Sequence, residues 1–316
     1  MPERRALGAS GLVTAPLMLG GNVFGWTADR RTSFDILDAF VAGGGMLIDT
    51  ADVYSAWVPG NAGGESETII GEWLKARGRR DDVLIATKMG MLDGPDGKGL
   101  DPKHIAAAAE ASLRRLGTDY IDLYFAHKDD ESVPQAEALG ALDALVGAGK
   151  VRAIGASNFT ADRLASALAA SDADGLARYT VLEPHYNLVE RGFEGALQDL
   201  CVAENIGVVP YYALASGFLT GKYRDASDAA KSGGRGAGAT KYLDDRGRRV
   251  LAALDAVAAE QDAAVATIAL AWLAARPAVV APIASASRID QLPELLYSMA
   301  IRLTADQIER LDAASA

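Results

Sequence analysis

Hydrophobic positions of the chain fall into two kinds of segment that alternate along its length. Short runs rich in β-branched and apolar residues predict strands, and each is followed by a longer segment with apolar residues at helical spacing. We expect eight strands, near residues 17–19, 46–48, 83–86, 121–125, 151–156, 180–182, 207–210 and 279–282. We expect helices around residues 33–42, 66–76, 102–116, 134–146, 161–170, 193–204 and 264–275, and an eighth that begins near residue 289.

This alternation predicts an α/β fold, a (β/α)8 TIM barrel. A doubly wound sheet would usually have fewer strands or a second domain. No linker rich in proline or serine divides the chain, so we expect residues 1–316 to form one domain. Residues 224–241, which are rich in glycine and charge, predict no regular element. We interpret them as a mobile loop, either simply solvated or a cover over a ligand.

Composition narrows the class of protein. With 50% hydrophobic and 23% charged residues, the chain can bury a globular core. Its 31 basic and 42 acidic residues give a net charge of −11, which disfavours nucleic acid as a partner. The most apolar stretch, residues 263–275, is too short to span about 30 Å of hydrocarbon, so no membrane partner is expected. The chain has no signal-peptide pattern and a single cysteine, so the cytoplasm is the expected compartment.

Polar residues suited to chemistry follow the predicted strands, where the loops of a TIM barrel build the active site. In chain order they include Asp49, Tyr54, Lys88, His127, Ser157, Asn158, Glu183, Tyr211, Ser287 and Arg288. Singly, each has a structural explanation, such as an ion pair between Asp49 and Lys88. Together, a carboxylate, a phenol, an amine and an imidazole at one rim indicate catalysis, because unused buried polar groups are costly.

These four groups suit proton delivery to a carbonyl oxygen. A tyrosine with its ordinary pKa of about 10 is a poor acid at neutral pH, and we expect the Lys88 ammonium to lower the pKa of Tyr54. Asp49 would keep Lys88 charged. His127 would hydrogen-bond the carbonyl oxygen and fix its direction. A hydride donor is still missing from this set.

A series of motifs along the whole chain indicates, by resemblance to a known family, where the hydride comes from. They are Ile48-Asp49-Thr50-Ala51-Asp52-x-Tyr54, Gly64-Glu65-Ser66-Glu67, Thr87-Lys88, His127, Gly155-Ala156-Ser157-Asn158-Phe159, Tyr186-Asn187-Leu188-x-x-Arg191, Gly217-x-Leu219-Thr220-Gly221-Lys222 and Ala286-Ser287-Arg288. In these motifs the sequence resembles the aldo-keto reductases, NAD(P)H-dependent enzymes built on a TIM barrel. The resemblance implies a catalytic tetrad, with Tyr54 as the general acid; its members are Asp49, Tyr54, Lys88 and His127.

The resemblance also implies how a nicotinamide cofactor would bind. Ser157 and Asn158 would hold its carboxamide, and Tyr211 would stack on its ring. The remaining positions expected to contact it are Glu183, Leu214, Gly217, Leu219, Lys222, Ser287, Arg288, Gln291 and Glu294. NADPH is expected rather than NADH, because Arg288 lies where the family meets the 2′-phosphate and a guanidinium suits a phosphate. NADH is the alternative.

Two positions depart from the family pattern. The family commonly has glutamine where this chain has Glu183, and asparagine where it has Leu295, which would loosen adenine binding. An ionised Glu183 would favour the positively charged oxidised ring, so Glu183→Gln would shift the relative affinity toward NADPH. Alternatively, burial raises the pKa of Glu183, and the neutral acid mimics glutamine.

The expected activity is reduction of an aldehyde or ketone, or the reverse oxidation, on a small-molecule carbonyl or alcohol substrate. Aromatic loop residues Phe24, Trp26 and Trp57 are the candidates for the substrate wall. No metal is expected, since the three histidines have no ligand spacing. The pair Tyr124 and Lys128 imitates the short-chain dehydrogenase signature, but no G-x-G-x-x-G motif accompanies it. The alternative function is a nicotinamide-sensing regulatory subunit with little turnover.

Overall fold

A parallel sheet of eight strands forms the centre of the protein, in a computed structural model that describes residues 2–225, 227–228 and 236–316. Its strands are β3 (Met18–Gly20), β4 (Leu47–Asp49), β5 (Leu84–Met89), β6 (Ile121–Ala126), β7 (Val151–Ser157), β8 (Tyr179–Glu183), β9 (Gly207–Val208) and β10 (Ile283–Ala284). Neighbours pair in the order β10-β3-β4-β5-β6-β7-β8-β9. The strands therefore follow chain order, except that the last strand lies beside the first.

Hydrogen bonds between β9 and the segment before β10 close the sheet. Val208 N–H donates to the Ala278 carbonyl at 2.9 Å, and Val280 N–H donates to the Val208 carbonyl at 2.8 Å. The predicted TIM barrel is thus confirmed. The predicted strand at 279–282 is wrong in position, because Pro282 has no N–H for a regular ladder and β10 begins one residue after it.

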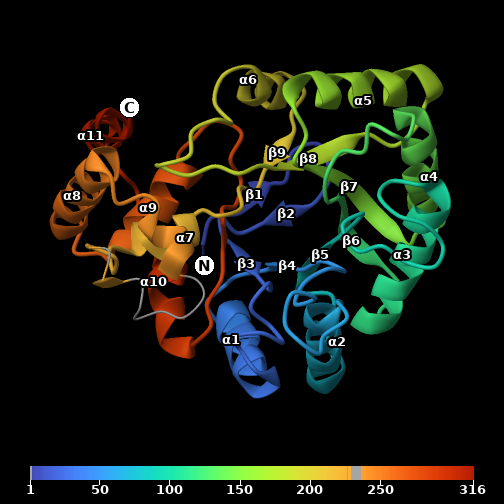
Figure 1. The fold of residues 1–316 in the computed structure, drawn as a ribbon, viewed down its shortest axis with the longest axis horizontal. Coiled ribbons are helices and arrows are strands. Elements are labelled where there is room, and N and C mark those ends of the chain that lie inside the picture. The colour runs from blue at the N-terminus through green and yellow to red at the C-terminus, as the bar shows by residue number, and fades with distance from the viewer. Residues whose placement is uncertain (1, 226, 229–235) are drawn as a thin grey trace.

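Helices surround the strands on the outside of the barrel (Figure 1). They are α1 (Arg30–Ala42), α2 (Glu65–Arg77), α3 (Pro102–Leu116), α4 (Gln135–Gly147), α5 (Ala161–Asp174), α6 (Ala196–Ala203), α7 (Gly236–Thr240), α8 (Asp245–Glu260), α9 (Val265–Ala274), α10 (Leu292–Tyr297) and α11 (Ala305–Ser315), with 3-10 turns η1 (Ala215–Thr220) and η3 (Ile289–Gln291). Helix α3 has the bounds that the sequence predicts. Asp101 accepts the Lys103 N–H at 2.8 Å at its start, and Gly117 ends it in the left-handed conformation.

A short hairpin closes the amino-terminal end of the barrel. Strands β1 (Arg5–Ala6) and β2 (Val13–Thr14) pair antiparallel, and Leu7 and Leu12 between them are buried with the apolar side chains that fill the barrel. Gly8 in this turn has φ +57°, and a Cβ atom there would lie 2.3 Å from the Gly207 nitrogen. Only glycine lets the hairpin rest directly on β9.

Two helical segments differ from the expectation. Residues 236–240, expected to lack regular structure, form α7, which packs on η1 and buries Ala239. That part of the prediction is wrong, because burial of one face outweighs the low helix propensity of glycine. Residues 226 and 229–235 of the same predicted loop lie outside the described residues. Helix α8 was not predicted, although its buried Val250, Leu251, Leu254, Val257 and Ala258 follow helical spacing.

Candidate active site

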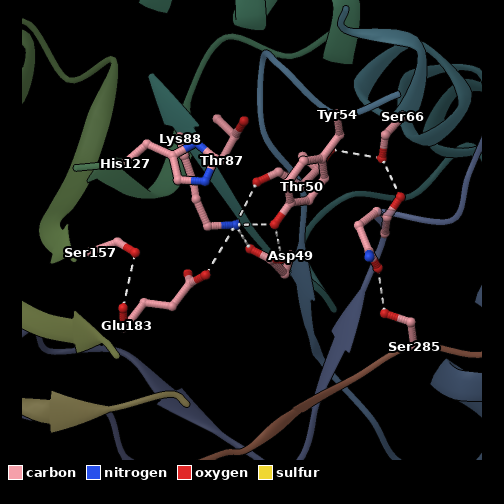
Figure 2. A network of polar contacts seen from close by, with 12 residues as sticks. Asp49, Thr50, Tyr54, Ser66, Thr87, Lys88, His127, Ser157, Glu183 and Ser285 are labelled. Atoms are coloured by element: carbon pink, nitrogen blue, oxygen red, sulfur yellow. Dashed lines mark hydrogen bonds and ion pairs between the residues drawn. The ribbon is translucent and has the colours of Figure 1, made fainter. Parts of the chain in front are cut away.

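Three polar side chains point into the barrel, one layer beyond the apolar side chains that fill it. Alternate residues of a strand point to the same face, so the residue two positions after an interior side chain also points inward. The interior residues of β4, β5 and β8 at this level are Leu47, Ala86 and Val181. Two positions later come Asp49, Lys88 and Glu183, all buried. Figure 2 shows these three side chains converging at the carboxyl end of the barrel.

Lys88 is the centre of this group. Its Nζ donates to Asp49 Oδ1, to the Thr50 carbonyl at 3.1 Å and to the Tyr54 hydroxyl at 2.8 Å. Glu183 Oε1 lies 3.4 Å from the same nitrogen. Burial disfavours the ammonium, but the Asp49 and Glu183 carboxylates outweigh burial and raise the pKa of Lys88. Lys88 is therefore charged, and its three protons are already donated.

Tyr54 lies on the loop between β4 and α2. Its hydroxyl accepts from Lys88 and donates to Asp49 Oδ2 at 3.0 Å. Burial and the Asp49 carboxylate raise the pKa of Tyr54 well above its ordinary value, despite the opposing effect of Lys88. Lys88 lowers the pKa of Tyr54, as expected, but burial and the Asp49 carboxylate raise it by more, so the net shift is upward. Tyr54 therefore keeps its proton at neutral pH, next to a cation that can stabilise the phenolate once the proton leaves.

His127 follows β6 and faces Tyr54, with ring centroids 6.1 Å apart. Burial and the Lys88 charge lower the pKa of His127 to about 3, so the ring is neutral. Its Nδ1 is buried and has no hydrogen-bond partner among the described residues. A neutral imidazole beside the acid can orient a carbonyl oxygen without adding charge.

The ends of β7, β8 and β9 are tied together by hydrogen bonds. Asn158 Nδ2 donates to the His127 carbonyl at 2.9 Å and to Ser157 Oγ at 3.1 Å, while its Oδ1 accepts from the Tyr211 hydroxyl at 2.7 Å. Ser157 Oγ donates to the Glu183 carbonyl at 2.9 Å. The structure thus brings together the four residues predicted to meet the nicotinamide. His185, a histidine for which the sequence indicated no role, stacks on Tyr211 with the two ring centroids 5.2 Å apart, and this contact supports the Tyr211 ring.

Glu183 has an unusual environment for a carboxylate. Its Oε2 is buried and has no partner in the described part of the chain, and its Oε1 lies 3.4 Å from the Lys88 ammonium. Burial, partly offset by Lys88 and reinforced by Asp49, raises the pKa of Glu183 to about 8. The neutral acid is therefore the main form at pH 7.

Two of the three predicted substrate-wall residues are available to a ligand. Trp26 is 38% exposed and Trp57 48% exposed, and their rings pack edge to face at 5.7 Å. Trp57 also lies 6.1 Å from the Tyr54 ring. Phe24 is fully buried in the core, so its assignment to the substrate wall is corrected. Phe24 packs within the main apolar core, whereas Trp26 and Trp57 remain at the surface.

The segment expected along the pyrophosphate contains η1, where Ala215, Ser216 and Gly217 have positive φ. Such consecutive left-handed residues turn the chain sharply and mark a backbone held by its surroundings. Leu214 is half-buried and Lys222 exposed. Leu219 is fully buried, so its side chain belongs to the core.

The residues expected at the adenosine end lie around η3. The Gln291 side chain accepts from the Ser287 N–H at 2.9 Å, and this bond shapes the turn. Arg288 is exposed and donates to Asp290 at 3.0 Å. Glu294 is exposed, whereas Leu295 is buried in the core. Arg288 is thus accessible to a ligand phosphate at the cost of a weak surface ion pair.

The residues present fit a nicotinamide cofactor. Two buried polar atoms at the catalytic end, Glu183 Oε2 and His127 Nδ1, have no partner among the described residues, and a carboxamide has the donor and acceptor groups that such atoms require. Within the described residues, no group of three or more His, Cys, Asp or Glu side chains could hold a metal ion. Nor does the described chain contain a single helix long and apolar enough to cross a membrane; α8 and α9 reach that length only as a pair bent by 96°.

The chain is similar to known proteins over nearly its whole length. Residues 16–316 match the sequence profile of the Aldo/keto reductase family. Norsolorinic acid reductase of Aspergillus flavus is 30% identical over 97% of this chain and 79% of its own. Protein tas of Escherichia coli is 32% identical over 96% of this chain and 95% of its own. A probable voltage-gated potassium channel subunit beta of Arabidopsis thaliana is 32% identical over 98% of this chain and 96% of its own.

Proposed function

Because the chain belongs to the aldo/keto reductase family, whose members are NAD(P)H-dependent oxidoreductases, we propose that it reduces aldehydes or ketones to alcohols, or catalyses the reverse oxidation. The observation that carries this proposal is the contact of Tyr54 with both Lys88 and Asp49. Burial and Asp49 keep the proton on the phenol, and Lys88 is placed to stabilise the phenolate that forms when the proton is donated. NADPH, with NADH as the alternative, is the proposed cofactor, and the cytoplasm the proposed compartment.

Each member of the tetrad has a separate task in this mechanism. A bound reduced nicotinamide supplies the hydride that goes to the carbonyl carbon. Tyr54 donates its proton to the carbonyl oxygen, and His127 orients that oxygen by a hydrogen bond. Lys88 stabilises the phenolate that remains, and Asp49 keeps Lys88 charged. In the oxidation direction Tyr54 takes the proton back.

Cofactor binding is assigned to the loops at the same end of the barrel. Ser157, Asn158 and Glu183 would hold the carboxamide, and Tyr211, supported by His185, would stack on the ring. The backbone around η1 with Leu214, Gly217, Leu219 and Lys222 would follow the pyrophosphate. The adenosine and its 2′-phosphate would meet Ser287, Arg288, Gln291 and Glu294.

The proposal is tested by following NADPH absorbance with a panel of aldehydes, ketones and sugars. We expect oxidation of NADPH with formation of one alcohol per cofactor consumed. The similarity to a potassium channel beta subunit makes a cofactor-sensing regulatory subunit the second candidate. Tight NADPH binding without oxidation by any member of the panel would favour this second candidate.

Replacing Arg288 by alanine should weaken NADPH binding more than NADH binding. Charge-assisted hydrogen bonds contribute about 1.5–3 kcal/mol, so we expect about a tenfold or larger rise in Kd for NADPH and little change for NADH. The matched control is Asp290→Asn, which releases Arg288 from its surface ion pair and should leave NADPH binding as tight or tighter. Equal losses for both cofactors in Arg288→Ala would exclude the phosphate role.

A further inference from the structure

The buried polar group at the catalytic end holds two carboxylates and one ammonium. Asp49 and Glu183 enter it from β4 and β8, and Lys88 enters from β5 between them. All three side chains are at most 3% exposed. With both carboxylates ionised, this group would carry a net charge of −1 out of contact with water. Such a charge is costly, and binding one proton removes it.

Hydrogen bonds show which carboxylate holds that proton. Asp49 has two donors, Lys88 on Oδ1 and Tyr54 on Oδ2. Glu183 Oε1 lies 3.4 Å from Lys88 Nζ, farther than this nitrogen lies from its partners on Asp49, Thr50 and Tyr54, and Glu183 Oε2 has no partner among the described residues. The anionic form is therefore stabilised more on Asp49 than on Glu183.

The other groups that face Glu183 do not compete for this proton near neutral pH. Lys88 stays charged, and Tyr54 stays protonated because its pKa is raised. Burial and Glu183 raise the pKa of Tyr211 to about 12, so it is also neutral. His127, which faces Lys88, has a lowered pKa and is uncharged. Burial also raises the pKa of Asp49, against the hydrogen bonds that it accepts from Lys88 and Tyr54. Glu183, whose Oε2 has no such donor among the described residues, is therefore the carboxyl that we assign to change charge near pH 8.

We propose that Glu183 is a redox-linked proton site, which holds a proton when the nicotinamide is reduced and releases it to solvent when the positively charged oxidised ring is bound. This inference rests on the proposed function. No electron passes through Glu183: its O–H bond breaks, and the proton leaves to water. Asp49 and Lys88 alone are neutral together, and the cationic ring then balances an ionised Glu183. With the neutral reduced ring, the protonated acid can donate to a carboxamide as glutamine would.

The test is the number of protons released when each cofactor binds. Calorimetric titrations in two buffers of different ionisation enthalpy, from pH 6 to pH 9, give this number for NADP⁺ and NADPH. We expect NADP⁺ to release up to one proton more than NADPH, with the largest difference near pH 7–8. Both cofactors carry the same phosphates, so any protons that the phosphates take up or release on binding cancel in this difference. By linkage, the ratio of NADP⁺ affinity to NADPH affinity should rise about tenfold or more between pH 6 and pH 8.

Two variants test whether the released proton comes from Glu183. Glu183→Gln keeps the shape of the side chain and cannot ionise, so the proton difference should vanish and the affinity ratio should change less than twofold over the same pH range. Glu131→Gln, an exposed carboxylate on the loop after β6, should behave as wild type. A purely structural role for Glu183 would leave the proton difference in place.

The outcomes separate this inference from the proposed function. Saturable binding of both cofactors with no proton difference in the wild-type protein would overturn the inference alone. An undiminished proton difference in Glu183→Gln would assign the proton to another group and would also overturn it. If neither cofactor binds, the proposed function and the inference fail together. The wild-type measurement stands whether or not the variant folds.

Discussion

Tyr54→Phe should lose nearly all carbonyl reduction and still bind NADPH with the wild-type Kd. The phenol is the proposed proton donor, and removing a positioned general acid slows a reaction about 10²- to 10⁴-fold. The ring remains, so its contact with Trp57 and the shape of the site are kept. The measurements are kcat from NADPH absorbance and Kd from a cofactor fluorescence titration.

Controls for this variant are available in the same chain. Tyr120→Phe removes a hydroxyl at the opposite end of β6 and should not change turnover. Because the pKa of Tyr54 is raised, the acid stays protonated over the neutral and mildly alkaline range, and reduction should not fall through Tyr54 ionisation below about pH 10. Near-normal turnover of Tyr54→Phe with intact cofactor binding would show that the proton comes from another group.

Lys88→Met should reduce both stability and activity. It leaves Asp49 and Glu183 buried without their cation, and breaking a buried ion pair costs about 3–5 kcal/mol. The pKa values of both carboxyl groups are raised by burial already in the wild-type protein, and losing Lys88 raises them further above the unfolded value of about 4, so folding takes up more protons. Stability then falls as the pH rises from about 4 toward the raised pKa values. Denaturant unfolding should therefore show a smaller defect at pH 5 than at pH 8.

A triple variant distinguishes charge from packing in this prediction. Asp49→Asn and Glu183→Gln, added to Lys88→Met, remove both buried carboxyl groups and should restore most of the free energy of unfolding at pH 8, without restoring turnover. If the triple variant is as unstable as Lys88→Met, and if the defect is equal at pH 5 and pH 8, the cost arises from lost packing and not from unpaired charge.

Local signals explain which elements could be predicted. Helix α3 has a capping aspartate and a proline at its start and a glycine just past its end, and all of these act within one turn of the chain. The apolar spacing of α8 is equally local, so the sequence alone carries the signal for this helix. Helix α7 and the β1–β2 hairpin are different, because each is stabilised by packing on a distant segment.

The candidate site divides in the same way. Sequence placed Asp49, Lys88 and Glu183 at strand ends, and the two-residue period of a strand with the barrel topology is enough to bring such residues to one rim. It could not assign Phe24 to the core and Trp26 to the surface, since both are aromatic residues of one loop. Their burial is decided by the neighbours that surround that loop in the folded chain.

By itself the sequence determined the barrel, the end at which its chemistry lies and the residue types available there, because periodicity and motif order are properties of the chain. Only the tertiary structure decided the charge states. The pKa values of Tyr54 and Glu183 depend on burial and on distances of about 3 Å to Lys88, which lies on another strand. Desolvation and the Coulomb attraction of Lys88 act in opposite directions on both groups, and desolvation is the larger effect. The positions of the surrounding groups in the folded chain set the balance of these effects, and that balance makes Tyr54 a protonated acid and Glu183 a titrating carboxyl.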